Sequence, residues 1–442
     1  MNIVIVNGSP KGNFSITLHT CLYIQKHFPM HEYHVLNVGQ QIKKIEKAPH
    51  EALQTLQNAD LILFSYPVYT FIAPSQLHHF IEIIKKSGID LRGKFVTQIT
   101  TSKHFYDVTA HRYIQDNCAD LGLHYIKGLS ADMDDLTKEQ GQTDARKFFQ
   151  YVCHCMENGL YESPSVDAPS AKASYVRTFT DTPKKAGKQT VIVADLCEDD
   201  PALKAMVEDF MAVYPYPARI VNIRQFPFSG GCISCFHCAA DGKCIYKDGF
   251  DSFLREQIQS ASSIVYACSI RDHSMGAQFK LYDDRQFCNG HRTVTMGMPM
   301  GHLVCGDLHS EENLRTIMQA RCEVGHNFFC GAATDAQGIT AMAQRMTYAL
   351  ENSYVQPQNF YGVGGMKIFR DLIYLMRGIM VADHKFYKKH GIYDFPQKKK
   401  GTLLAMLLVG KLMNSPKLRA KMGDKISQGM IAPYKKVLKQ KP

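Results

Sequence analysis

The chain has 442 residues, of which 45% are hydrophobic and 21% are charged, so it is not of a disordered type and can form two domains of ordinary size. Its net charge of +10 is unevenly distributed: residues 360–442 carry 18 Lys and Arg against 4 Asp and Glu, whereas residues 1–359 carry 33 against 37. The nearly neutral body argues against nucleic acid as its partner.

The first residues predict a cytoplasmic protein. An apolar strand at residues 3–6 follows Met1 almost directly, without the basic segment and cleavage site of a secretory signal. In a cytoplasmic protein, 14 cysteines do not predict a disulfide framework. Four of them are clustered, and we expect the other ten to be small buried side chains.

Residues 1–160 predict a first α/β domain, because short apolar segments alternate with segments of helical spacing. Two of the expected helices are Ser75–Ser87 and Thr109–Leu121. Strands alternating with helices predict a doubly wound parallel sheet, with ligands beyond the carboxyl ends of the strands. The expected strands are Ile3–Asn7, Tyr33–Asn37, Leu61–Ser65, Phe95–Thr100 and His124–Gly128.

Residues 161–188 are rich in Ser, Pro, Ala and Lys and predict a linker, after which residues 189–355 repeat the pattern of the first domain. The same order of elements predicts an internal duplication, with a second parallel sheet. The expected strands are Thr190–Asp195, Arg219–Asn222, Ser263–Ala267, Arg292–Met298 and Asn327–Ala332. The expected helices are Pro201–Tyr214, Gly249–Ser260, Gln278–Phe287, Leu308–Val324 and Gly338–Asn352.

Residues 356–442 predict a basic helical extension, with helices at Met366–Val381 and Thr402–Met413. The uninterrupted apolar segment 403–409 is too short to span a bilayer. We favour a helical extension packed over the two domains. A helix lying on a membrane surface and the binding of an acidic protein are the alternatives.

The turn after the first strand, residues 7–17, has the features of a phosphate site. Gly8 and Gly12 free the backbone, and the following helix start presents unpaired N–H groups and the positive end of its dipole. Polar side chains surround this turn, which suits a phosphate monoester. A plain helix entry is the alternative interpretation.

A second loop, residues 65–77, follows the third strand and offers flat apolar faces and backbone amides to a tricyclic ring. The strand at 95–100 continues into Thr101 and Ser102, small hydroxyl residues that could line the same pocket. The segments Gly8–Asn13, Pro67–Tyr69 and Pro74–Leu77 resemble the NAD(P)H-dependent FMN reductases of the flavodoxin-like superfamily, over residues 1–155. This resemblance implies a flavodoxin-like fold, FMN, and NAD(P)H as electron donor. The predicted FMN-binding residues are Ser9, Lys11, Asn13, Ser15, Thr17, Pro67, Val68, Tyr69, Thr70, Phe71, Thr101 and Ser102.

Cys232, Cys235, Cys238 and Cys244 form a C-x2-C-x2-C-x5-C arrangement. Thiolates with this close spacing can surround one iron–sulfur cluster, whereas zinc sites more often separate two cysteine pairs by a longer segment. Zinc and an empty site remain alternatives. The spacing also resembles the iron–sulfur flavoprotein branch of the same family, which implies a [4Fe–4S] cluster near FMN.

The sequence departs from that branch because the flavin loops and the cysteines lie in different domains. The turn of the second domain that corresponds to the phosphate turn carries Asp195, Glu198, Asp199 and Asp200, which would repel a phosphate dianion. We therefore expect one FMN, on the first domain, and one cluster, on the second, with single electrons passing between them.

The two sites predict a flavin-dependent oxidoreductase that passes electrons from NAD(P)H or a redox protein partner to a small organic acceptor. No catalytic residue is assigned; Tyr69, His104 and Tyr106 are at most proton donors. The alternatives are a non-enzymatic electron carrier, or a plain FMN reductase whose cysteines hold zinc or nothing. Relatives commonly form homodimers, which the tandem could replace internally.

Neither His78–His79 nor Cys153–Cys155 is expected to hold an ion, because adjacent helical residues point to different faces.

Overall fold

The computed structural model describes residues 1–162, 174–415, 428, 431, 432, 434, 435 and 438. The chain divides into two compact units, Met1–Phe386 and Tyr387–Pro442. Residues 163–173 of the predicted linker lie outside the described residues, and its remaining residues contain no helix or strand. The predicted domain boundaries therefore stay a prediction.

The first half contains one parallel sheet with the strand order β2-β1-β3-β4-β5. The central strands are buried on both faces and therefore consist of nearly continuous apolar residues. The bounds are β1 Asn2–Asn7, β2 Glu32–Leu36, β3 Leu61–Pro67, β4 Phe95–Ser102 and β5 His124–Tyr125, and β6 Leu129–Asp132 also pairs with β4.

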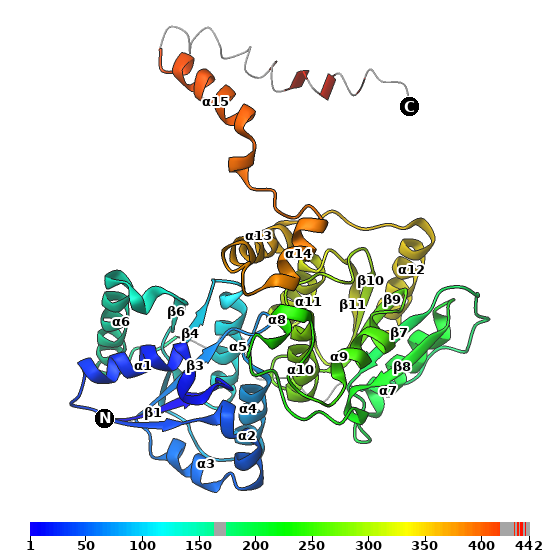
Figure 1. Cartoon of the computed structure of the whole chain (residues 1–442). Helices are drawn as coiled ribbons and strands as arrows, with labels where there is room; N and C mark the ends of the chain where they lie inside the picture. Colours follow the sequence, from blue (N-terminus) through cyan, green and yellow to red (C-terminus); the bar gives the residue numbers. More distant parts are fainter. Residues whose placement is uncertain (163–173, 416–427, 429–430, 433, 436–437, 439–442) are drawn as a thin grey trace. The chain divides into compact units, whose positions relative to one another are not determined.

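Helices cover both faces of this sheet (Figure 1). Helices α1 and α6 pack on one face, where the side chains of Ile3, Ile5, Leu18 and Phe149 form the core. Helices α2, α4 and α5 lie on the opposite side. The bounds are α1 Ile16–His27, α2 Val38–Lys47, α3 His50–Gln57, α4 Ser75–Ser87, α5 Asp107–Asp120 and α6 Glu139–Glu157.

The second half repeats this architecture with the strand order β8-β7-β9-β10-β11, which is the order of the first sheet without β6. Helices α7 and α12 enclose a separate core on one face. The strands are β7 Thr190–Ala194, β8 Ala218–Asn222, β9 Ser263–Ser269, β10 Pro299–Cys305 and β11 Phe328–Ala333. The main helices are α7 Pro201–Val213, α10 Gly276–Arg285, α11 Glu312–Val324 and α12 Ala336–Asn352. The predicted tandem of doubly wound parallel sheets is confirmed.

Three predicted elements of the two sheet-forming halves differ from the structure. The strand expected at Arg292–Met298 is wrong: this segment is a loop, and the strand begins at Pro299. Tight turns, with Met296 N–H donating to Thr293 O and Met298 N–H to Thr295 O, keep the segment out of the sheet. The strand expected at His124–Gly128 is divided into β5 and β6. The helix expected at Gly249–Ser260 is also divided: it consists of α9 Phe250–Phe253 and a π-helical turn at Leu254–Ile258.

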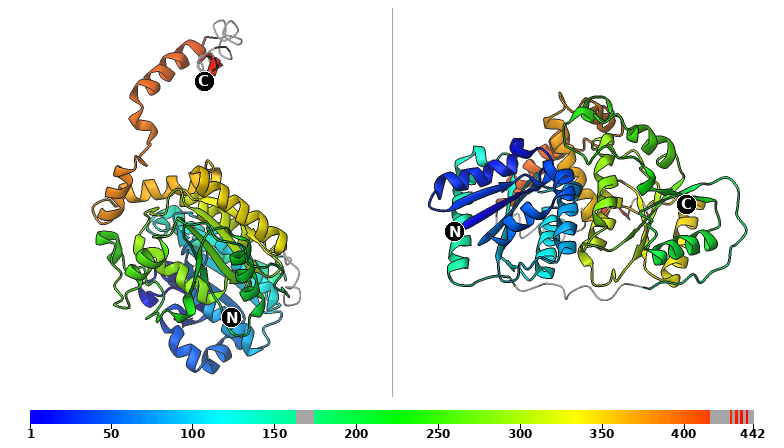
Figure 2. Two further views of the ribbon diagram at one scale, coloured as in Figure 1. Left: turned by 90° about the vertical axis from the view of Figure 1, so that its right-hand side faces the viewer. Right: turned by 90° about the horizontal axis from the view of Figure 1, so that it is seen from below.

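The two halves meet through equivalent helices, because α4 packs against α10 and α5 packs against α11. Figure 2 shows the two halves side by side, the first in blue to cyan and the second in green to yellow. In an isologous dimer, both subunits use the same surface to contact each other. The two halves of this chain do the same, so the chain contains within itself an interface of the kind that two identical subunits form.

This interface is polar and buried. The Asp272 carboxylate, fully buried, accepts hydrogen bonds from His78 Nδ1 at 2.6 Å and from the Tyr113 hydroxyl at 2.8 Å. Asn117 Nδ2 donates to the Asp272 carbonyl at 2.9 Å. Burial alone would raise the pKa of Asp272, but its partners hold it at about 2. Buried charges are tolerated when they are paired in this way.

The first helix of the C-terminal extension, α13 Phe360–Leu375, packs on the body as expected, with contacts to both halves. The Phe369 ring stacks on Phe105 with centroids 4.3 Å apart, and the Tyr106 hydroxyl donates to the Tyr361 carbonyl at 2.7 Å. The helix expected at Met366–Val381 ends earlier, and α14 Val381–Lys389 and α15 Lys400–Met413 follow. In the described part of the chain, no helix combines the length and the hydropathy needed to cross a membrane.

His273 at the interface makes stability depend on pH. Its Nδ1 lies 2.7 Å from Glu311 Oε1 and its Nε2 lies 2.9 Å from Asp120 Oδ2. Burial opposes the charged imidazolium, but the two carboxylates outweigh it and raise the pKa of His273 to about 9. Because the pKa in the unfolded chain is about 6.5, this stabilisation is complete below about pH 6.5 and is lost as the pH rises through the folded value.

We expect the free energy of unfolding of the unmodified protein to fall by roughly 3 kcal/mol more than that of the His273→Gln variant between about pH 6.5 and pH 9.5. Urea unfolding of both proteins across this range, in reductant, measures the difference. Equal pH slopes for the two proteins would contradict the role given to His273.

Candidate functional site

The turn between β1 and α1 is shaped by its own side chains. Asn7 Nδ2 donates to the Gly12 carbonyl at 3.0 Å, and Asn7 Oδ1 accepts from Ser9 N–H at 3.2 Å. Gly12 has a φ of +53°, which only glycine adopts without strain. Ser15 caps α1 by accepting from Leu18 N–H at 3.3 Å. A structured turn at a helix N-terminus, with hydroxyl groups beside it, fits a phosphate monoester.

The second predicted loop has a strained backbone. Thr70 and Phe71 have φ values of +43° and +74°, a region that non-glycine residues rarely adopt. The residues on either side of this turn form an isolated antiparallel bridge, in which Tyr69 and Ile72 exchange backbone hydrogen bonds of 2.8 and 3.1 Å. Such strain persists only where the surroundings hold the backbone in place.

The surroundings that hold this loop come from the other half of the chain. Lys280 of α10, fully buried, donates from Nζ to the Tyr69 carbonyl and to Thr70 Oγ1, both at 3.0 Å. Asp284 accepts from Thr70 Oγ1 and from Ser75 N–H, both at 2.8 Å. Lys280 and Asp284 also form an ion pair with each other. The second half therefore fixes the conformation of a loop in the first half.

The four clustered cysteines lie in the segment that follows β8, around the short helix α8 His237–Asp241. Cys232 Sγ accepts from Ser234 N–H at 3.4 Å, and the Cys238 thiol donates to the Phe287 carbonyl at 3.0 Å. Burial, together with the neighbouring thiols of Cys235 and Cys244, raises the pKa of Cys238 to about 11. The thiols of Cys235 and Cys244 thus lie near that of Cys238.

Arg285, at the end of α10, holds the two ends of the cysteine segment together. Its guanidinium donates to the Gly230 carbonyl at 2.8 Å and to both oxygens of Asp248 at 2.9 and 2.7 Å. It also lies 3.8 Å from Cys244 Sγ. The side chain is 1% exposed, so its positive charge acts on the thiols with little screening by water.

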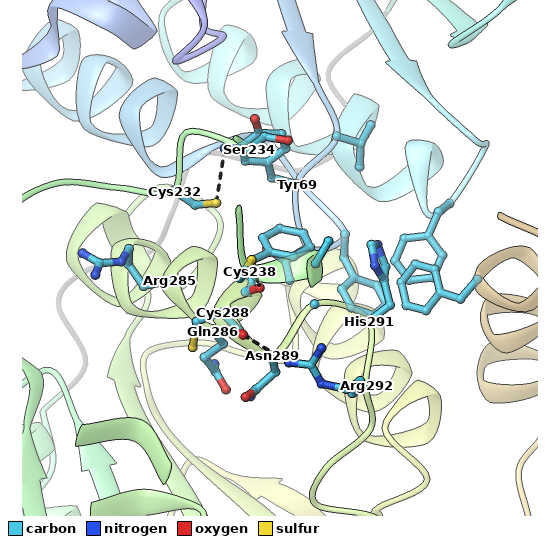
Figure 3. A pocket seen from close by; sticks show the side chains of 18 of the residues that line it. Tyr69, Cys232, Ser234, Cys238, Arg285, Gln286, Cys288, Asn289, His291 and Arg292 are labelled. Atoms are coloured by element: carbon cyan, nitrogen blue, oxygen red, sulfur yellow. Dashed lines mark hydrogen bonds between the residues drawn. The ribbon is translucent and has the colours of Figure 1, made fainter. Parts of the chain in front are cut away.

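A single cavity of about 380 Å³ joins the two predicted sites. All the predicted FMN-binding residues except Asn13 line it, and so do all four cysteines. Asn13 lies outside, where its Oδ1 accepts from Asn37 Nδ2 at 3.3 Å. Figure 3 shows Tyr69 of the first half beside Cys232 and Ser234 of the second. Lys11 Nζ lies 5.4 Å from the centre of the Phe236 ring, a further contact between the two loops.

The cysteine ligand set itself stays a prediction. Among the described residues, no three His, Cys, Asp or Glu side chains converge as metal ligands. Of the other ten cysteines, eight are buried as expected and Cys153 and Cys197 are half-buried. Two of the eight, Cys288 and Cys322, also line the cavity.

The sequence analysis missed the residues that close the cavity on the side of α13. Arg292 donates to Asp383 Oδ1 at 2.8 Å, and His291 Nδ1 lies 3.5 Å from Asp383 Oδ2. The ring of Phe369 meets that of His291 with centroids 4.6 Å apart. Gly290 and Gly297, which enclose the loop, were a signal that could have identified it; no local pattern marks Asp383.

Of the three candidate proton donors, only Tyr69 lines the cavity. Burial and the nearby Cys232 raise the pKa of its hydroxyl. His104 Nδ1 instead lies 2.8 Å from Asp107 Oδ2, and the Tyr106 hydroxyl donates to α13. His78 and His79 bind different carboxylates, those of Asp272 and Glu46.

In the second half, the turn that corresponds to the phosphate turn is occupied by ion pairs. Arg224 Nε lies 2.6 Å from Asp195 Oδ1, and Arg271 donates to Cys197 Sγ at 3.3 Å. Asp200 caps α7 by accepting from Leu203 N–H at 3.2 Å and also accepts from the Ser269 hydroxyl. The carboxylates of this turn cap a helix and pair with the two arginines. The arginines are therefore neutralised, and the turn offers no cationic environment to a phosphate.

Comparison with known proteins agrees with this fold. Residues 1–144 match the family of the flavodoxin-like fold. The chain is a tandem of two doubly wound sheets, and the match lies on the first of them. It is also similar to an iron–sulfur flavoprotein of Archaeoglobus fulgidus, with 22% identity over 177 residues that cover 36% of this chain and 78% of the relative.

Solved structures with some similarity each correspond to about one domain. An FMN-dependent NADH-azoreductase of Bacillus anthracis, in complex with FMN, is 15% identical, with a TM-score of 0.28, over 36% of this chain and 99% of the other. An NAD(P)H:quinone oxidoreductase of Methanothermobacter marburgensis is 13% identical, with a TM-score of 0.29, over 37% and 98%. An NADH:FMN oxidoreductase in its apo form is 18% identical, with a TM-score of 0.31, over 37% and 92%.

We expect the Asp284→Asn variant to bind FMN roughly 10- to 100-fold more weakly, because the change removes the closer of the two carboxylates that pair with buried Lys280 and loosens the strained loop. Titration of the cofactor-free protein with FMN, followed by flavin fluorescence, measures the dissociation constant. Glu351→Gln, which makes the same chemical change in the exposed pair with Lys185, is the control. Equal affinities of Asp284→Asn and the unmodified protein would show that the loop does not need this support.

Proposed function

We propose that this protein is an FMN-dependent oxidoreductase that carries a [4Fe–4S] cluster and passes electrons from NAD(P)H or a redox protein to a small organic acceptor. The observation that carries the proposal is the shared cavity, in which loops with flavin-site character and four cysteines face one space. The similarity to an iron–sulfur flavoprotein supports the same combination of groups.

The first half would hold FMN through two loops. Ser9, Ser15 and the start of α1 would bind the phosphate, and Lys11 adds a positive charge at the cavity wall. The segment from Pro67 to Phe71 would contact the flat ring. Bound FMN supplies the chemistry of accepting a hydride and releasing electrons singly. The chain's contribution is to orient the ring and to exclude water with the aromatic side chains around it.

The second half would hold the cluster through Cys232, Cys235, Cys238 and Cys244. Their donor set fits a soft, sulfur-ligated group, and the Ser234 N–H and Arg285 are placed to stabilise negative charge on sulfur. The corresponding turn of the second half, with its paired carboxylates, favours one FMN per chain rather than two. Zinc at the cysteines would leave a plain FMN reductase, and a protein without turnover would be an electron carrier.

An anaerobic absorption spectrum, with flavin and iron quantified per chain, tests the proposal. We expect one FMN and about four irons, the content of one cubane cluster. FMN without iron would contradict the cluster and leave the flavin reductase. A protein that contains neither group and fails to bind added FMN would contradict the proposed function altogether.

The Cys238→Ser variant is expected to lose most of its iron and the associated absorption while it keeps its FMN, because the phosphate loop and the second loop belong to the other half. Iron and flavin analysis after purification in parallel measures both contents. Cys153→Ser changes a half-buried cysteine on α6, outside the cavity, and is the control. Full iron content in Cys238→Ser would remove this cysteine from the ligand set.

A further inference from the structure

Helix α15, Lys400–Met413, leaves an unusual number of apolar side chains exposed within the C-terminal unit. Leu404, Leu407 and Leu408 are 61%, 67% and 56% exposed. Leu403, Met406 and Val409 are exposed as well. Large apolar side chains gathered on one surface mark an interaction site rather than an ordinary protein surface.

These side chains surround the helix instead of forming one stripe. Successive residues of an α-helix are about 100° apart, so the positions 403, 404 and 406–409 point in all directions around the axis. A stripe would fit a groove on a protein partner, whereas apolar side chains on most of the circumference suit a helix that sinks into the boundary between lipid headgroups and acyl chains. With 14 residues, α15 is about 21 Å long, shorter than the hydrocarbon core of a bilayer, which is about 30 Å thick.

Lysines stand at both ends of the apolar segment. Lys398, Lys399 and Lys400 precede it and Lys411 follows it. The whole region 360–442 carries 18 Lys and Arg against 4 Asp and Glu. An acidic protein surface would pair with the lysines but would leave the leucines in water, whereas an anionic lipid surface satisfies both.

We propose that α15 anchors the protein peripherally to an anionic lipid bilayer, with its leucines among the upper parts of the acyl chains and its lysines at the headgroups. The anchor is independent of the proposed redox function, since it uses none of the residues of the cavity. It would hold the oxidoreductase body at a membrane surface.

Flotation of the full-length protein with vesicles tests this anchor. We expect the protein to float with vesicles of phosphatidylcholine and phosphatidylglycerol, to bind pure phosphatidylcholine vesicles far more weakly, and to lose affinity as salt is added. Leu404→Glu/Leu407→Glu should reduce binding to the anionic vesicles by about 100-fold or more, because it removes two buried apolar side chains and adds two like charges.

Met30→Glu/Val176→Glu is the matched control, because it places two charges at apolar residues that are 70% and 79% exposed, far from α15 in the sequence. This variant should bind the vesicles like the unmodified protein. Failure of the unmodified protein to float, or equal flotation of the α15 variant and the control, would overturn the proposal.

The chain contains no tryptophan, so Leu407→Trp introduces a unique fluorescent reporter in α15. We expect its emission to be that of a solvated indole in buffer and to shift to shorter wavelength when anionic vesicles are added. Short-wavelength emission in buffer that vesicles do not change would show that α15 is buried against protein, and would overturn the proposal even if the variants misfold.

Discussion

The loop expected to contact the flavin in the first half is held by the buried pair of Lys280 and Asp284 from the second half. Removing one partner of such a pair typically costs about 3–5 kcal/mol, because it leaves an uncompensated charge away from water. The hydrogen bonds from this pair to Tyr69 and Thr70 hold the loop in a conformation that Thr70 and Phe71 would rarely adopt alone. The two halves therefore form one functional unit, although each has its own sheet and core.

The duplication explains how one chain could divide the two proposed cofactors between its halves. Equivalent helices form the interface, so each half presents the same type of surface to the other. The segments that follow the second strand of each half have diverged: the first half has α2 and α3 there, and the second half has the cysteine segment. That segment contacts the other half, as Lys43 Nζ donates to the Ser229 carbonyl at 2.6 Å. Divergence at one equivalent position thus brings the cysteines to the flavin loops of the other half.

Periodicity and motif order predicted both sheets, nearly all their strands and most of the residues that line the cavity from the first half. These features are local: a phosphate turn is encoded within about ten residues of chain, and so is a cysteine segment. The segment Arg292–Met298 was wrongly predicted as a strand because its β-branched residues have strand character, while hydrogen-bonded turns decide its conformation. Lys280, Arg285 and Asp383 could not be identified, since their roles depend on contacts with residues 37 or more positions away.

The most direct test of the central claim is the position of iron relative to FMN in a crystal of the protein. Diffraction data collected at the iron absorption edge would locate iron independently of the protein atoms. The account predicts one iron site at Cys232, Cys235, Cys238 and Cys244, in the same cavity as FMN bound to the β1–α1 turn of the first half. Iron elsewhere, or FMN at the turn after β7, would contradict the division of the two cofactors between the halves.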